Sequence, residues 1–131
     1  MLWQRQQGGY DFKHDFVRVV LSPSDGELLA YRKNWGQTPE AFTIRISKDT
    51  AIQAAGAGVV LHFKAKRAPD GNVSGPVVVC PNDVFGASPV GSDTRRLAWV
   101  VAYPKQPEYR NDMEVWVDAE NGRLLGGEIL W

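Results

Sequence analysis

Alternation of apolar and polar residues dominates this chain, and a period of two is typical of β-strands. The clearest runs are FVRVVL at 16–21 and RLAWVVAY at 96–103, which are rich in β-branched and aromatic residues. Turn residues such as Gly, Pro, Asp and Ser separate the runs. The predicted strands are residues 16–21, 27–33, 61–66, 77–80, 96–103, 114–117 and 124–130.

One segment has a helical pattern instead. Ser47 is a suitable N-cap, Asp49 places a negative charge in the first turn, and alanines with Ile52 supply a small apolar stripe. Gly56 or Gly58 is expected to end this helix within three turns. The sequence therefore predicts an α+β fold in which a short helix packs on an antiparallel sheet of about four strands, preceded by a separate strand hairpin.

Two segments of the chain repeat one pattern. Aligned on Gly26 and Gly122, residues 17–35 and 113–131 each contain an apolar run, a polar turn closing on glycine, a Leu-Leu pair and a final tryptophan. Such self-similarity indicates a repeated structural unit, and repeats change the expected fold.

Composition narrows the class of protein. The 131 residues are the size of one ordinary domain, and 44% hydrophobic residues suffice for a core. The 15 basic and 15 acidic side chains balance, so no nucleic-acid partner is predicted. No apolar run approaches the roughly 20 residues that cross a bilayer, so no membrane insertion is predicted. The first residues also lack the basic and apolar stretches of a signal peptide.

Candidate chemistry is sparse. Cys80, the only cysteine, excludes an internal disulfide, and a nucleophilic role would need His14 or His62 as its base. A small buried side chain at the end of VVVC is the favoured interpretation of this cysteine. The segment starting at Asp118 resembles a calcium loop, but Ile129 stands where the bidentate glutamate is needed. The sequence predicts no enzyme, no metal site and no cofactor.

The tryptophans divide into two groups. Trp99 and Trp116 lie in predicted strands and are expected in the core, while Trp3 and Trp35 leave core and binding surface equally open.

The second half of the chain resembles the PepSY domain. The resemblance rests on ISKDTAIQAA, then RLAWVVAY, then the closing pattern V-D-A-x-x-G-x-L-L at 117–125. It covers about residues 42–131, and the closing pattern is similar to the end of the propeptides of thermolysin-like metallopeptidases. The motif is interpreted as structural, and its residues are Asp118, Ala119, Asn121, Gly122 and Leu124.

The resemblance implies a division of the chain and two functions. Residues 1–38 would be the hairpin and linker of a partial preceding repeat, and residues 39–131 a PepSY-like domain. One implied function is a non-catalytic module that modulates or inhibits a peptidase. The alternative is a structural repeat of a larger secreted or cell-envelope protein, whose partners are neighbouring repeats. The loop at 85–93 is the candidate contact surface, with Phe85, Val90 and Asp93 as candidate residues.

Overall fold

Seven β-strands and one helix make up the described part of the chain. The structure is a computed structural model that describes residues 1–86, 94–106, 109 and 111–130. The elements are β1 (Leu2–Gln7), β2 (Tyr10–Leu21), β3 (Leu28–Asn34), α1 (Lys48–Phe63), β4 (Asn72–Val79), β5 (Arg96–Tyr103), β6 (Asp112–Asp118) and β7 (Leu124–Leu130). Among the described residues, 49% lie in strands or isolated β-bridges and 13% in the helix.

The predicted α+β fold with about four strands is wrong. All seven strands form one sheet in the order β1-β2-β4-β5-β6-β7, with β3 paired to β2 off this path. The first strands join the sheet because β2 is twelve residues long. Its first half reaches β4, where Phe12 pairs in parallel with Val78, and its second half pairs with β3. The polar segment LWQRQQ, which was not predicted as a strand, forms β1 along the other edge of β2.

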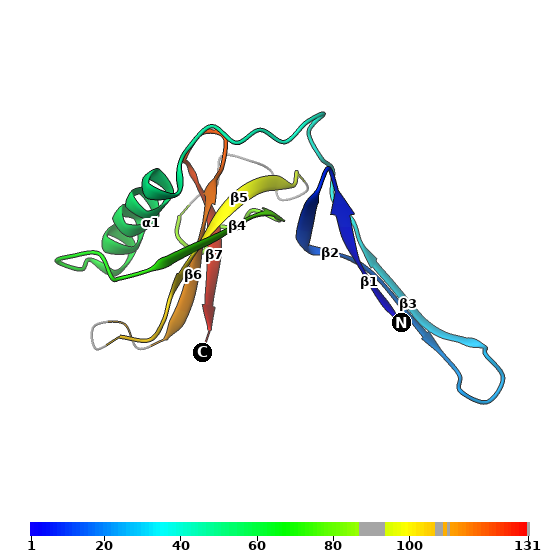
Figure 1. The fold of residues 1–131 in the computed structure, drawn as a ribbon. Coiled ribbons are helices and arrows are strands. Elements are labelled where there is room, and N and C mark those ends of the chain that lie inside the picture. Colours follow the sequence, from blue (N-terminus) through cyan, green and yellow to red (C-terminus); the bar gives the residue numbers. More distant parts are fainter. Residues whose placement is uncertain (87–93, 107–108, 110, 131) are drawn as a thin grey trace.

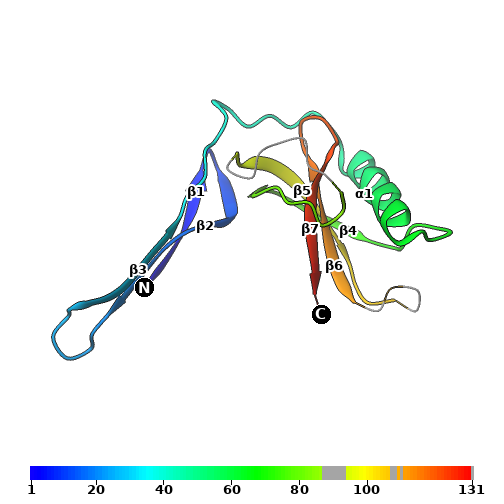
Figure 2. The ribbon, with the colours of Figure 1, turned by 180° about the vertical axis from the view of Figure 1, so that it is seen from behind.

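The strands form two structural parts (Figure 1). We call α1 with β4–β7 the body, and β1–β3 the arm. In the body, α1 lies across one face of the sheet, and the core between them contains aromatic, valine and alanine side chains. The arm projects away from the body, and the view from behind shows the same separation (Figure 2).

The helix begins as predicted and ends later. Ser47 is the N-cap, and its side-chain oxygen accepts a hydrogen bond from the amide of Thr50 at 3.2 Å. The helix continues through Gly58 to Phe63, so the predicted strand at 61–66 is wrong. Close packing explains the glycine, because a Cβ atom at Gly58 would collide with the side chain of Leu124. From the local sequence alone, Gly58 is expected to end the helix. In the structure, Gly58 instead allows the helix to approach Leu124 closely.

The remaining body strands follow the sequence pattern. The predicted strands at 96–103 and 124–130 coincide with β5 and β7, and the predicted strand at 114–117 lies within β6. No helix in the described part of the chain is long and apolar enough to cross a membrane.

Candidate interaction surface

The β2–β3 and β6–β7 hairpins have the same residue pairing. With Gly26 aligned to Gly122, all six paired positions of one hairpin have an equivalent pair in the other, and the register shifts at the same place. The matching pairs are Phe16–Asn34 with Asp112–Leu130, Val17–Lys33 with Met113–Ile129, Arg18–Arg32 with Glu114–Glu128, Val19–Tyr31 with Val115–Gly127, Val20–Ala30 with Trp116–Gly126, and Leu21–Leu28 with Val117–Leu124. Two segments with the same repeat pattern therefore form the same local structure.

The turns of the two hairpins are also alike. The Gly26 amide donates to the carbonyl of Ser22 at 3.0 Å, and the Gly122 amide donates to the carbonyl of Asp118 at 2.9 Å. Both glycines have a positive φ, 73° and 75°, which glycine adopts without steric cost.

Strand β1 occupies in the arm the place that β5 occupies in the body. Leu2 pairs with Arg18, and Trp3 pairs with Val17. The equivalent body pairs are Ala102–Glu114 and Tyr103–Met113. The arm therefore reproduces the end of β5, the whole of β6 and the whole of β7.

The equivalent faces differ in what covers them. In the body, the face that carries Tyr103, Met113, Val115 and Val117 is buried in the core beneath α1. The corresponding side chains of the arm lie on a face that we call the apolar arm face. Its residues are Met1, Trp3, Val17, Val19, Leu21, Leu28 and Tyr31.

The apolar arm face is open to solvent. Trp3 is 51% exposed, Leu28 57% and Tyr31 60%, and Val17 and Val19 are half-buried. Contiguous exposed apolar side chains on a soluble protein mark interaction surfaces. The sequence left the role of Trp3 open, and the structure places it on this surface.

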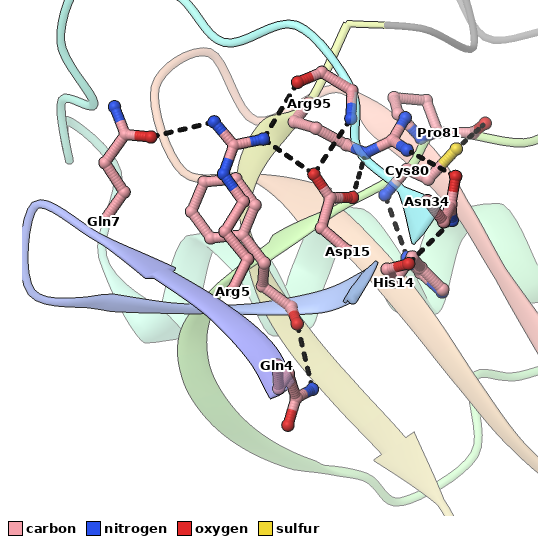
Figure 3. A network of polar contacts seen from close by, with 11 residues as sticks. Gln4, Arg5, Gln7, His14, Asp15, Asn34, Cys80, Pro81 and Arg95 are labelled. Atoms are coloured by element: carbon pink, nitrogen blue, oxygen red, sulfur yellow. Dashed lines mark hydrogen bonds and ion pairs between the residues drawn. The ribbon is translucent and has the colours of Figure 1, made fainter. Parts of the chain in front are cut away.

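A buried ionic cluster joins the arm to the body (Figure 3). The carboxylate of Asp15, on β2, accepts hydrogen bonds from Arg5 Nη1 at 2.8 Å, from Arg95 Nε at 2.5 Å and from the Gly36 amide at 3.0 Å. All three charged side chains are at least nine-tenths buried. Burial raises the pKa of the Asp15 carboxyl, but the hydrogen bonds from Arg95, Gly36 and Arg5 outweigh it and hold the pKa below its usual value.

Aromatic rings enclose one of these cations. The Arg5 guanidinium carbon lies 4.4 Å from the centre of the Phe12 ring and 4.2 Å from the Trp35 ring. Stacking on two rings restricts the guanidinium to the orientation that meets Asp15. Trp35, whose role the sequence also left open, therefore helps to hold Arg5 against Asp15 at the base of the arm.

Next to this cluster, His14 contacts the residue that follows β4 and a tryptophan of β6. Its Nδ1 atom accepts a hydrogen bond from the backbone amide of Cys80 at 3.0 Å, and its ring centre lies 5.0 Å from that of Trp116. Burial lowers the pKa of His14, against the opposing effect of Glu128, whose carboxylate lies 3.7 Å from Nε2. This hydrogen bond uses the backbone amide of Cys80 and joins β2 to the residue that follows β4.

The motif residues lie in and around the β6–β7 turn. Asp118 is buried, with its carboxylate 2.7 Å from Arg96 Nη2, and Asn121 Oδ1 accepts from the Arg123 amide at 2.9 Å. The carbonyl of buried Ala119 accepts hydrogen bonds from the backbone amides of Arg45 and Ile46, which lead into the helix. Gly122 forms the turn, and Leu124 begins β7 against Gly58 of α1.

The predicted contact loop is described only at its start. Phe85 is 8% exposed, and its ring contributes to the body core near His62, at 5.2 Å between ring centres. Val90 and Asp93 lie outside the described residues. Within the described part of the chain, no three His, Cys, Asp or Glu side chains gather in a way that could hold a metal ion.

Sequence reasoning did not find the ionic cluster. Arg5, Asp15 and Arg95 are far apart along the chain, and each alone looks like an ordinary charged residue in or beside a strand. Asp15 follows Lys13 and His14 in the polar first half of β2, so nothing in the local sequence distinguishes it. Only the tertiary structure identifies its partners.

Comparison of the chain with protein-family models, with curated proteins and with solved structures finds no match. The resemblance to the PepSY domain therefore rests on the sequence motif itself.

Proposed function

We propose that this chain is a non-catalytic, PepSY-like interaction repeat whose arm docks onto a partner protein. In this proposal, residues 1–38 are the closing part of one repeat and residues 39–131 form the next. One observation carries the proposal: the arm has the strand register of the β6–β7 hairpin, but the face that α1 covers in the body is open.

The physical basis of docking is burial of a preformed surface. Transfer of a large apolar side chain from water to an interface contributes about 1.5–3 kcal/mol. The buried cluster of Asp15 with Arg5 and Arg95 fixes the base of the arm on the body. A fixed arm loses little conformational entropy on binding, so more of the burial energy remains as affinity.

Dye binding tests whether this face is open in solution. Val19 and Val20 are adjacent half-buried valines that point to opposite faces of β2, so Val20→Glu is a matched control for Val19→Glu. We expect an environment-sensitive apolar dye to bind the unmodified chain, and its fluorescence to fall severalfold in Val19→Glu but not in Val20→Glu. Equal dye fluorescence in both variants would refute the proposed docking surface, provided that circular dichroism shows unchanged strand content.

Restraint of a peptidase is the other function that the resemblance implies. Titration of the chain against a thermolysin-like peptidase, with peptide turnover and the intact mass of the chain recorded together, separates the two functions. An interaction repeat should leave turnover unchanged. Saturable inhibition by an uncut chain would replace the repeat proposal with peptidase restraint.

A further inference from the structure

We infer that the partner of the apolar arm face is a second copy of this chain's own segment 37–100, which carries an α1-type helix and a β5-type strand. The inference rests on the proposed docking function and names the partner. The helix would lie across the apolar arm face as α1 lies across the body sheet, and the strand would extend the line of β1.

The chemistry of α1 defines the helix that fits. The residues that α1 buries are mostly small: Ala51, Ala55, Gly58 and Val59 recur at spacings of four, seven and eight residues. They let the helix approach the sheet so closely that Gly58 touches Leu124. Leu28 is the arm equivalent of Leu124, so the Gly58 side of an α1-type helix fits it. Tyr31 stands where the body has Gly127, so the ring of Phe85 in the added segment would have to lie to one side of Tyr31.

The edge of β2 provides the place for the strand. The pairing between β1 and β2 ends at the hydrogen bond that the Val19 amide donates to the Met1 carbonyl, at 2.8 Å. Beside it lies a hollow of about 410 Å³, lined by Met1, Leu2 and residues 18–21.

In the body, the corresponding edge of β6 is paired. Val100 pairs with Trp116, and Trp99 pairs with Val117. These two residues of β6 are the equivalents of Val20 and Leu21 in the arm. A β5-type strand ending before Met1 would therefore pair with β2 at the hollow.

Charge also favours this occupant. Two basic residues of the arm, Arg18 and Arg32, lie at opposite positions of the β2–β3 register and point to the other face of the arm. Apart from Lys33 near the base, the side chains that share the apolar arm face on β2 and β3 beyond Asp15 are uncharged. The terminal ammonium of Met1 is the other charge at this place, and it donates a hydrogen bond to the Val19 carbonyl at 2.6 Å. The small, uncharged inner surface of an α1-type helix can therefore cover this face without burying an unpaired charge.

A chain extended by residues 37–100 placed directly before Met1 tests the inference. In this chain the added Val100 continues into Met1, which is the arm equivalent of Val101. The matched control carries Ala51→Glu and Ala55→Glu in the added copy only, which keeps helix-forming residues but charges the surface that would face the sheet. Hydrogen–deuterium exchange followed by mass spectrometry then reports on arm residues 17–21 and 28–33.

The expected result is that exchange of these arm amides slows by about tenfold or more in the extended chain, but not in its control. No slowing in the extended chain would overturn the inference, whether the added segment folds by itself or is degraded. Equal slowing in the extended chain and its control would also overturn it, because the helix surface would then be irrelevant. Slowing that appears in the unextended chain as its concentration rises would identify arm-to-arm association as the correct alternative.

The two proposals fail separately. The dye experiment on Val19→Glu tests whether the face is open and does not depend on its partner. If the dye result holds and the extended chain shows no protection, the docking function stands and this partner is wrong.

Discussion

Replacement of Asp15 by asparagine should strongly destabilise the joint between arm and body. Asparagine has nearly the same shape as aspartate but no charge, and one end of its amide is a donor. In Asp15→Asn, the buried side chains of Arg5 and Arg95 would face each other without the carboxylate between them. The Gly36 amide would compete for the one remaining side-chain oxygen.

The magnitude follows from the burial of the cluster. Removing one partner of a buried ion pair typically costs about 3–5 kcal/mol, because the remaining charge stays desolvated. The guanidinium of Arg5 retains its bonds to the Gly36 carbonyl and to Gln7, so we expect the lower end, about 3 kcal/mol. For a chain of this size, that corresponds to a fall in Tm of about 10 °C.

Urea unfolding of Asp15→Asn, followed by circular dichroism, measures this loss. Asp11→Asn is the matched control, because Asp11 lies on the same strand but is exposed, and its carboxylate accepts a hydrogen bond from the uncharged side chain of Gln6. The control should change the free energy of unfolding by less than about 0.5 kcal/mol. A loss below about 1 kcal/mol in Asp15→Asn would refute the view that this cluster fixes the arm.

Acidification should remove the same contribution. Because the pKa of Asp15 is lower in the folded chain than in the unfolded chain, its stabilisation is complete above the unfolded value of about 4. The stabilisation is lost as the pH falls through the lower, folded pKa. The unfolding free energy of Asp15→Asn should therefore fall less steeply below about pH 4 than that of the unmodified chain.

Three further changes test other parts of the structure. His14 has a folded pKa below its unfolded value of about 6.5, so stability should decline as the pH falls from there towards the folded pKa, and urea titrations of His14→Asn should lack this decline. Gly127→Ala should lower the free energy of unfolding in urea by about 2 kcal/mol, because its Cβ would overlap the Glu114 carbonyl and the Phe85 ring. The change at the equivalent arm position, Tyr31→Ala, should be nearly neutral, because Tyr31 is exposed. Equal losses in the two variants would contradict the different packing of the two hairpins. Asp118→Asn should lower Tm by several degrees through its buried ion pair, and an unchanged Tm would show that this pair contributes nothing.

Local pattern predicted much of the body and part of the candidate surface. The hairpin at 113–131 and its copy at 17–35 were found from the sequence alone, since alternation and turn glycines are encoded within a few residues. The N-cap at Ser47 was also predictable from neighbouring residues, and the structure confirms it. The apolar arm face could not be found in this way, because an apolar strand face has the same sequence pattern whether or not another element covers it.

Long-range contacts account for the errors. Gly58 does not end the helix, and the reason for a glycine at this position is distant: the side chain of Leu124 occupies the space that a side chain of residue 58 would fill. The β1 segment is a strand because it pairs along β2, although four of its six residues are polar and show no alternation.

The sequence by itself determined the repeated hairpin, most strands and the start of the helix, because short-range periodicity and capping depend on neighbouring residues. Only the tertiary structure decided that β2 reaches β4 and completes a seven-stranded sheet, that Asp15 binds Arg5 and Arg95, and that one copy of the hairpin is covered by a helix while the other is open. These features depend on which distant segments meet, and that choice is made by packing and pairing of the whole chain.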